Sequence, residues 1–302
     1  MSRLIGILVA CLAFSEIAFA QTTQELILPV AVNGYVKAPI HYQTTLRIVN
    51  LSAKAVQVTA EAYQNDGTAV QIFDLFPIVR LGTKKVFDLA AFGSVEAFTA
   101  EDVPDLNGWI RLTFDATANV LATAEVSLIN APVGPHPICM RPSTDIITSV
   151  QVPAVSASRK AGGAAVIRPN RLSAYAIVNP SPTQSATVYL SLFDPGAKFI
   201  GSATAVIPPQ GRVSRTLSEV FPAATSDLMG SLRITSTSPV AAGAVHILLP
   251  EGKFVSLEVQ SIPSGTCSQV IAPARNPLTN ECRVFSTPCD VPEGWQIVQS
   301  CN

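Results

Sequence analysis

The chain reads Gly-Trp-Ile-Arg-Leu-Thr at residues 108–113 and Gly-Ser-Leu-Arg-Ile-Thr at residues 230–235. From the third residue of each stretch onward, aliphatic side chains alternate with polar ones. A period of two residues is typical of a β-strand that buries one face. The third and fifth residues of each copy are therefore predicted to face a hydrophobic core, and the arginine between them to face away from it.

The similarity between the two halves extends beyond these strands. Three further pairs share one spacing of 129 positions: Leu46–Asn50 with Tyr175–Asn179, Gly67 with Gly196, and Gly82 with Gly211. A common spacing predicts that one structural unit has been duplicated. The glycines of the repeated strand are only 122 positions apart, so the first copy is predicted to hold seven extra residues between Gly82 and Gly108.

Each copy is predicted to consist of short strands. The chain has 23 prolines and 17 glycines, which interrupt it too often for long helices. In the second copy, Asp194–Gly196 has the composition of a turn, and a strand is predicted over Phe199–Ile207. A series of about seven short strands separated by turns is typical of an antiparallel β-sandwich. We therefore predict an all-β protein.

The predicted order is a signal peptide, two sandwich domains joined by a proline-rich linker, and a cysteine-rich C-terminal module. Their predicted bounds are 1–20 for the signal peptide, 21–131 and 147–262 for the sandwich domains, 132–146 for the linker and 263–302 for the module. A sandwich domain of roughly 100 residues is long enough to bury a core of its own.

The N-terminus has the three parts of a secretory signal peptide. Arg3 supplies a positive charge, residues 4–14 are almost all apolar, and Ala18–Ala20 has the pattern of a cleavage site. The mature chain is then expected to begin near Gln21 and to be secreted or periplasmic. An alternative interpretation is a lipid anchor at Cys11, because the residues before it resemble a bacterial lipobox.

Charge and hydropathy exclude several classes of partner. The formal net charge is −1 and 14% of residues are charged, which argues against binding to nucleic acid. After the signal peptide, no segment has the ~18 consecutive apolar residues of a membrane-spanning helix. The expected partners are therefore a protein or a cell-envelope polysaccharide, and the sequence predicts no particular oligomeric state.

Four cysteines are concentrated near the C-terminus: Cys267, Cys282, Cys289 and Cys301. An exported segment this short cannot bury enough apolar surface to fold alone, so we predict disulfides among them. All three possible pairings remain open. A zinc site is the weaker interpretation, because the cysteines are not spaced as zinc ligands usually are. Cys139, in the linker, is the odd thiol, either free or paired with the tail or with another molecule.

Motifs that would indicate catalysis are not found in the sequence. It has no G-x-S-x-G, no H-E-x-x-H and no glycine-rich phosphate loop. The three histidines, His41, His136 and His246, are interpreted as structural. We therefore predict a non-catalytic protein without a cofactor, except for the calcium candidate that follows.

An acidic loop precedes the first of the two repeated strands. Glu101, Asp102, Asp105 and Asn107 offer oxygen ligands of the kind that calcium prefers. Their spacing is not that of an EF-hand, so the loop is either a candidate calcium site or an ordinary acidic surface loop. A further interpretation is a hydrolase that uses two of these carboxylates as a glycosidase pair.

Trp109 lies on the same face of its strand as Arg111, opposite the predicted core face. An outward-facing tryptophan can stack on a sugar ring, which makes Trp109 and Arg111 candidate ligand-binding residues. The alternative is that the indole covers the stem of Arg111 or packs in an interface between the domains.

Three segments of the second copy resemble strand and turn motifs of immunoglobulin-like and fibronectin-III-like domains of bacterial secreted and surface proteins. They are Ile177–Pro180, Pro209–Val213 and Gly230–Thr235. The first copy departs from the pattern, since it lacks the proline after Asn50 and the paired prolines before Gly82. The resemblance implies tandem sandwich domains and a role in binding, spacing or assembly. We expect a surface, adhesion or assembly module; the alternative is a carbohydrate-binding protein that uses Trp109 and the Glu101–Asn107 loop.

Overall fold

The computed structural model describes residues 23–37, 40–70, 84–99, 105–130, 145–224, 227–248, 253–262 and 270–301. Most of these residues lie in antiparallel β-strands, so the all-β prediction is confirmed. The signal peptide, Cys11 and the part of the linker that holds Cys139 lie outside the described residues.

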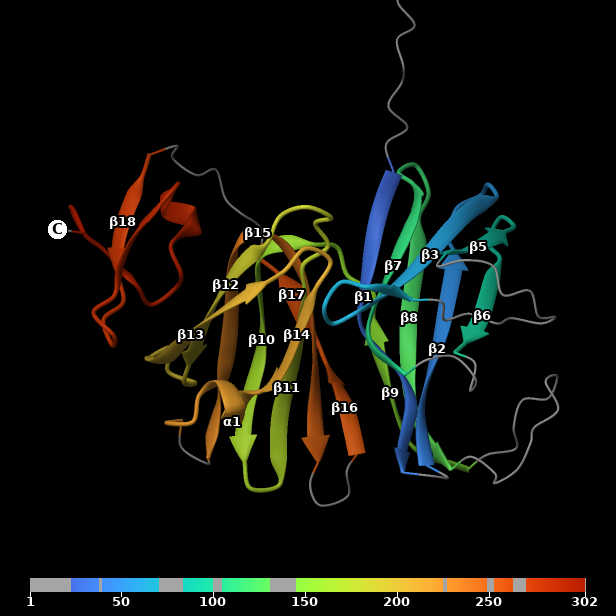
Figure 1. The fold of residues 1–302 in the computed structure, drawn as a ribbon, viewed down its shortest axis with the longest axis horizontal. Helices are drawn as coiled ribbons and strands as arrows, with labels where there is room; N and C mark the ends of the chain where they lie inside the picture. Colours follow the sequence, from blue (N-terminus) through green and yellow to red (C-terminus); the bar gives the residue numbers. More distant parts are fainter. Residues whose placement is uncertain are drawn as a thin grey trace, which may run out of the picture.

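The first unit of the chain, residues 23–155, forms a sandwich-like arrangement of antiparallel strands (Figure 1). The strand order is β4-β3-β7-β1-β2-β8-β9, with β5 paired to β3 and β6 paired to β2. The strand β1 pairs first with β7 and then with β2, so it connects the two layers. The strands are β1 (Thr23–Lys37), β2 (Ile40–Asn50), β3 (Val56–Gln64), β4 (Ala69–Val70), β5 (Lys84–Leu89), β6 (Ser94–Phe98), β7 (Leu106–Asp115), β8 (Val120–Asn130) and β9 (Asp145–Pro153).

The second unit, residues 158–261, repeats this topology with the order β13-β12-β15-β10-β11-β14. Its long strand β15 corresponds to β7 and β8 joined together, since its first part pairs with β10 and β12 and its last part with β11 and β16. The elements are β10 (Ser158–Arg168), β11 (Arg171–Val178), β12 (Ala186–Phe193), β13 (Phe199–Ile207), β14 (Arg212–Thr216), α1 (Leu217–Val220), β15 (Leu228–Leu248), β16 (Lys253–Leu257) and β17 (Val259–Ser261).

The repeated stretches occupy equivalent places in the two units. Ile110 and Leu112 are fully buried in the core of the first unit, and Leu232 and Ile234 are 1% exposed in the core of the second. The alternation of the two stretches therefore predicted the core face correctly. The predicted strand at Phe199–Ile207 is also confirmed, as β13.

An asparagine makes the same local contacts in both units. Asn50 donates its side-chain amide to the carbonyls of Lys54 and Ala90, and its Oδ1 accepts from the Ser52 backbone. Asn179, at the spacing of 129, donates in the same way to three carbonyls: those of Gln184, Ile207 and Pro208. Both side chains are fully buried. The duplication thus extends from the strand pattern to a buried polar contact.

We expect Asn50→Ala and Asn179→Ala each to lower the free energy of unfolding by about 2–3 kcal/mol, because each leaves buried carbonyl groups without a donor. Asn119→Ala, at an exposed position in a neighbouring turn, is the matched control and should change it by less than about 0.5 kcal/mol. Urea unfolding followed by circular dichroism measures both. Equal stabilities of the Asn50 and Asn119 variants would contradict the assigned role.

The predicted equivalence of Gly82 and Gly211 is wrong, because another residue takes that place in the first unit. The backbone N–H of Asn179 donates to the Gly211 carbonyl, and the backbone N–H of Asn50 donates to the carbonyl of Gly93. The preceding residues, Phe92 and Gln210, both have φ of 56°. The extra residues of the first unit therefore lie before this turn, between β4 and β5, and not between the turn and Gly108. Gly82 itself lies outside the described residues.

The predicted boundary between the units also needs correction. The strand β9 begins at Asp145, inside the predicted linker and the predicted second domain, yet it pairs with β8 along its whole length. Val155 then forms a bridge with Ile27 of β1. Residues 145–155 thus complete the first unit, and the boundary lies between Val155 and Ser158. The local sequence pattern does not distinguish the last strand of one unit from the first strand of the next.

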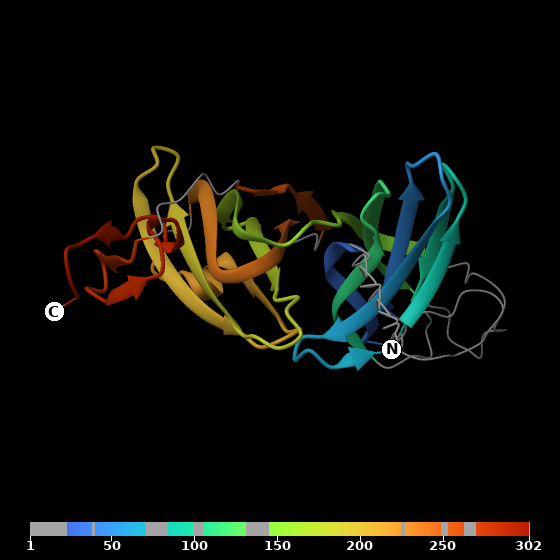
Figure 2. The same cartoon turned by 90° about the horizontal axis from the view of Figure 1, so that it is seen from above.

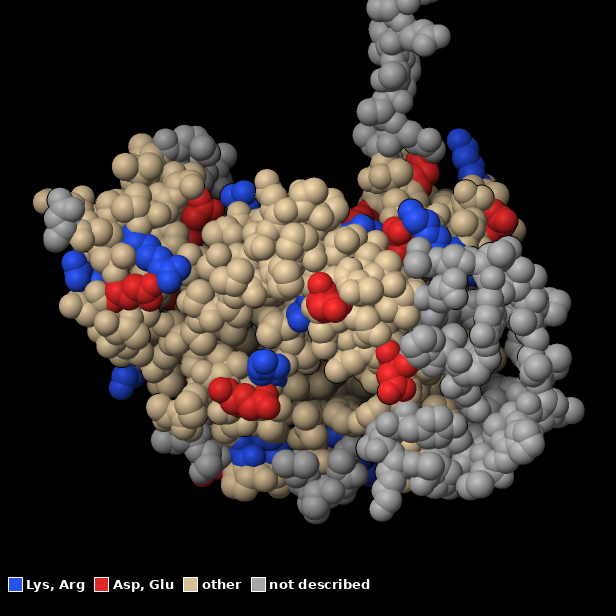
Figure 3. Space-filling view, viewed as in Figure 1, with Lys and Arg blue, Asp and Glu red and all other residues tan. Residues whose placement is uncertain are grey.

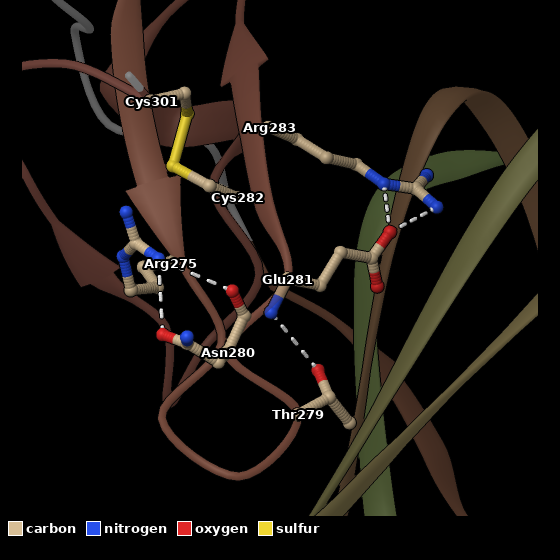
Figure 4. The surroundings of a disulfide bond; sticks show 7 residues. All are labelled: Arg275, Thr279, Asn280, Glu281, Cys282, Arg283 and Cys301. Atoms are coloured by element: carbon tan, nitrogen blue, oxygen red, sulfur yellow. Dashed lines mark hydrogen bonds and ion pairs between the residues drawn. A yellow bond between two sulfur atoms is a disulfide. The ribbon is translucent and has the colours of Figure 1, made fainter.

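The tail module is a three-stranded sheet beside the second unit, on the side away from the first (Figure 2). Its elements are β18 (Ala272–Arg275), β19 (Cys282–Phe285), a 3-10 helix (Pro288–Asp290) and β20 (Gln296–Ile297). Figure 4 shows the disulfide between Cys282 and Cys301, beside a turn in which Arg275 contacts Asn280. Cys289 is also disulfide-bonded, whereas Cys267 lies outside the described residues.

The tail packs its aromatic side chains on the second unit. Tyr189 of β12 meets Phe285 and Trp295 edge-on, with ring centroids 5.7 and 6.2 Å away. The Ser191 hydroxyl donates to the carbonyl of Glu293 at 2.7 Å. The tail therefore covers the outer face of β12, which is the side of the strand that does not face the core.

Replacing Cys282 and Cys301 together by serine is expected to destabilise the tail by about 3 kcal/mol, because the disulfide closes a loop of 19 residues. Trp295 fluorescence and limited proteolysis of the tail should report the change. Circular dichroism of the β-sheet signal is the control, because the cores of the two large units do not include the tail. A tail that resists proteolysis equally with and without the disulfide would contradict this expectation.

Candidate functional site

The candidate site lies where the first and second units meet, and Arg212 is at its centre. This arginine begins β14 of the second unit and is 7% exposed. Its guanidinium donates to Oδ1 of Asn65 and of Asn107 and to the carbonyls of Pro29 and Gly108, which all belong to the first unit. All four acceptors are neutral. Burial lowers the pKa of Arg212 to about 10, so the group is still charged at neutral pH.

Trp109 lies beside Arg212 and is fully buried. Its indole N–H donates to the carbonyl of Gln210 in the second unit at 2.8 Å, and its ring stacks on Tyr63 with centroids 4.6 Å apart. The apolar cluster around it contains residues of both units: Ile27, Tyr63, Trp109, Val178 and Ala241. Trp109 therefore packs in the interface between the two units, and neither face of its ring is accessible to a sugar.

Arg111 lies on the same face, with its guanidinium carbon 5.3 Å from the Trp109 ring centroid. It forms an ion pair with Glu25 and donates to the carbonyl of Pro180 across the interface. Burial raises the pKa of the Glu25 carboxyl, and the neighbouring Arg111 opposes this shift. Both candidate ligand-binding residues of the repeated strand therefore serve contacts between the units.

An open cleft of about 770 Å³ runs beside these contacts. Figure 3 shows it as a hollow between the units, with charged side chains on its rim. Its walls are mainly apolar and come from both units, among them Val32, Tyr42, Val126, Val150, Val245 and Phe254. Polar groups line the rest, among them Asp105, Asn107, Arg215 and Glu219. The cleft is thus suited to an apolar ligand with polar groups near its ends.

The acidic side chains of the rim come from different elements. Glu219 accepts from the backbone N–H of Thr216 at the start of α1, and this hydrogen bond is the main cause that lowers the pKa of Glu219. The Asp105 carbonyl accepts from the Gln64 side chain, which orients the start of β7. The Glu219 carboxylate is thus fixed at a helix terminus.

Of the four residues of the candidate calcium site, the structure describes two, Asp105 and Asn107. Glu101 and Asp102 lie outside the described residues. Asp105 and Asn107 are exposed, but the side-chain oxygen of Asn107 already accepts from Arg212. Within the described ranges, no group of three or more His, Cys, Asp or Glu side chains is placed to hold a metal ion.

Neither of the two described histidines lines the cleft, although both belong to strands that do. His41 is buried on β2. His246 on β15 lies 3.1 Å from the hydroxyl of Ser173, and burial lowers its pKa. His136 is outside the described residues.

The most connected residue of the site, Arg212, was not among the predicted site residues. The sequence did contain a signal, because Arg212 follows the turn glycine Gly211 within a segment quoted for its family resemblance. The equivalent position of the first unit, after Gly93, is Ser94. Because the first unit folds with serine at this position, Arg212 is not required by the fold that the two units share.

The chain matches no protein-family model, and comparison with curated proteins and with solved structures finds no match. Among the residues that the structure describes, no helix is both long enough and apolar enough to cross a membrane.

Proposed function

We propose that this protein is a non-catalytic, exported binding and assembly module made of two immunoglobulin-like sandwich domains. We further propose that the cleft between them receives an extended apolar segment of a protein partner. The proposal rests on the cleft itself, whose apolar walls belong to two sheets that Arg212 holds together. An apolar groove with fixed walls loses little entropy when a ligand enters it.

An extended peptide suits this cleft because a strand edge borders it. The strand β14 is last in its sheet order and contributes Ser214, Arg215 and Thr216 to the lining. At the start of this edge, the Arg212 backbone N–H donates to the carbonyl of Asn65, which belongs to the first unit. A bound peptide would continue this line of hydrogen bonds, and its alternate side chains would reach the apolar wall.

A random peptide library selected on the full-length exported chain tests the proposal. We expect enrichment of peptides with apolar residues at alternate positions. Val245→Glu should weaken their binding about tenfold or more, because it places a charge in the apolar wall. Val206→Glu is the matched control, since Val206 is 68% exposed on β13 and is not part of the cleft.

Two results would contradict the proposal: binding of the selected peptides that is insensitive to Val245→Glu, and chemical turnover of a bound ligand. A glycan array with the same protein and variants examines the carbohydrate alternative. Glycan binding that is lost in Val245→Glu would show that the cleft takes sugars instead of peptides.

A further inference from the structure

One part of the contact between the units is made by one end of the second sandwich. The contact residues are Val178 and Pro180 at the end of β11, Gln210 and Arg212 around the turn before β14, and Ala241 on β15. They lie against the outer face of β3, β7 and β1 in the first unit, where Tyr63, Trp109 and Ile27 are located. One end of a sandwich thus rests on the flat face of another.

The duplication identifies the same end on the first unit. Asn50 corresponds to Asn179, which makes Leu51 the counterpart of Pro180. Val49 pairs with Leu121 as Val178 pairs with Ala241. The turn residue Phe92 has the same φ, and the same place before the turn glycine, as Gln210.

These counterparts form an exposed apolar patch, which we call the free-end patch: Leu51, Phe92 and Leu121. Their exposed fractions are 41%, 70% and 57%. Backbone hydrogen bonds place them together, since Phe92 donates to Ser52 and Leu51 donates to Asn119. Phe92 is also in the left-handed region, an unfavourable conformation for a bulky aromatic residue. An aromatic side chain held exposed in this way is typical of a binding surface rather than of a simple turn.

We propose that the free-end patch docks on the outer sheet face of a β-sandwich domain in a different protein, as the second unit docks on the first. The partner face would carry a row of aromatic or aliphatic side chains next to a cation, as Tyr63, Trp109 and Arg111 do.

The described part of a second copy does not offer this aromatic face. The face of β1, β3 and β7 that carries Tyr63 and Trp109 is covered by the second unit, and the outer face of β12 is covered by the tail. The free-end patch is also separate from the cleft, so either proposal can fail while the other holds.

Site-specific photo-crosslinking in the organism that encodes the chain tests this docking. A photoreactive phenylalanine analogue is placed at Phe92 or at Leu121 of the full-length protein, with Val206, exposed elsewhere, as the control position. We expect adducts from the first two positions and none from the control. The crosslinked partner peptide should lie in a strand of a sandwich domain, at an outward-facing residue.

Leu51→Asp, introduced together with the analogue at Phe92, should reduce the yield of adduct about tenfold, because it places a carboxylate in the apolar contact. Its thermal stability should equal that of the parent protein, since Leu51 is exposed. The proposal is overturned by adducts to a second copy of the chain, to lipid or polysaccharide, or to a partner segment that is not a sheet face. It is equally overturned if neither position yields an adduct.

Discussion

Gly108→Ala and Gly230→Ala are each expected to abolish stable folding of the unit concerned, with a loss of more than about 4 kcal/mol. A Cβ atom at Gly108 would lie 1.8 Å from the carbonyl oxygen of Tyr63, and one at Gly230 would lie 1.9 Å from that of Phe193. Both obstacles are backbone atoms of the neighbouring strand, so no side-chain rearrangement can remove them. Separating the strands instead would break the pairs of β3 with β7, or of β12 with β15.

Thermal unfolding followed by circular dichroism measures this effect. Gly196→Ala is the matched control, because the nearest atom to its added Cβ is the end of the Asp194 side chain at 3.3 Å. The control should therefore stay within about 1 kcal/mol of the parent protein. If either strand glycine variant had the same melting temperature as the control, the close approach of the two strands would not constrain this position to glycine.

The same two glycines explain why part of the fold could be predicted from the sequence. They are retained in both copies because a strand carbonyl approaches them closely, and they begin stretches whose alternation identifies the core face. Local physical constraints of this kind act within a few residues and leave a visible pattern.

The turn equivalence was predicted wrongly for a related reason. Gly82 was matched to Gly211 by residue type and spacing alone. The conformation that defines this turn belongs to the preceding residue, and both Phe92 and Gln210 adopt positive φ without being glycine. The predicted match of Gly67 with Gly196 is also displaced by one residue. Gly67 has φ of 91°, but the corresponding positive φ in the second unit is at Ala197.

The site itself was beyond a sequence-based prediction because it depends on how two units meet. Alternation placed Trp109 and Arg111 on the outer face correctly, but an outer face can be covered by solvent, by a ligand or by another part of the same chain. The partner of Trp109 is the carbonyl of Gln210, which lies 101 residues away in the sequence. No local pattern encodes a contact of that range.

Arg212→Met is expected to lower the free energy of unfolding by about 3 kcal/mol and to loosen the contact between the units. Methionine keeps the volume of the aliphatic stem but leaves four acceptors without their donor: the buried carbonyls of Pro29 and Gly108 and the less buried side-chain oxygens of Asn65 and Asn107. The effect exceeds that of removing a surface ion pair, because water cannot readily replace the guanidinium in a buried position.

Arg212→Lys should lie between the parent protein and Arg212→Met. An ammonium keeps the charge but cannot present donors in the planar arrangement of a guanidinium, so it reaches fewer of the four acceptors. Arg215→Met, three residues further along the same strand and exposed, is the matched control and should change stability by less than about 0.5 kcal/mol.

Urea unfolding followed by tryptophan fluorescence, combined with small-angle X-ray scattering, separates the two consequences of Arg212→Met. Each unit has its own hydrophobic core, so a weaker interface should divide one unfolding transition into two. Scattering should show a larger radius of gyration while both cores stay folded, because the interface would open before either sandwich does. A single transition with unchanged dimensions would mean that the apolar cluster around Trp109 holds the units together without Arg212.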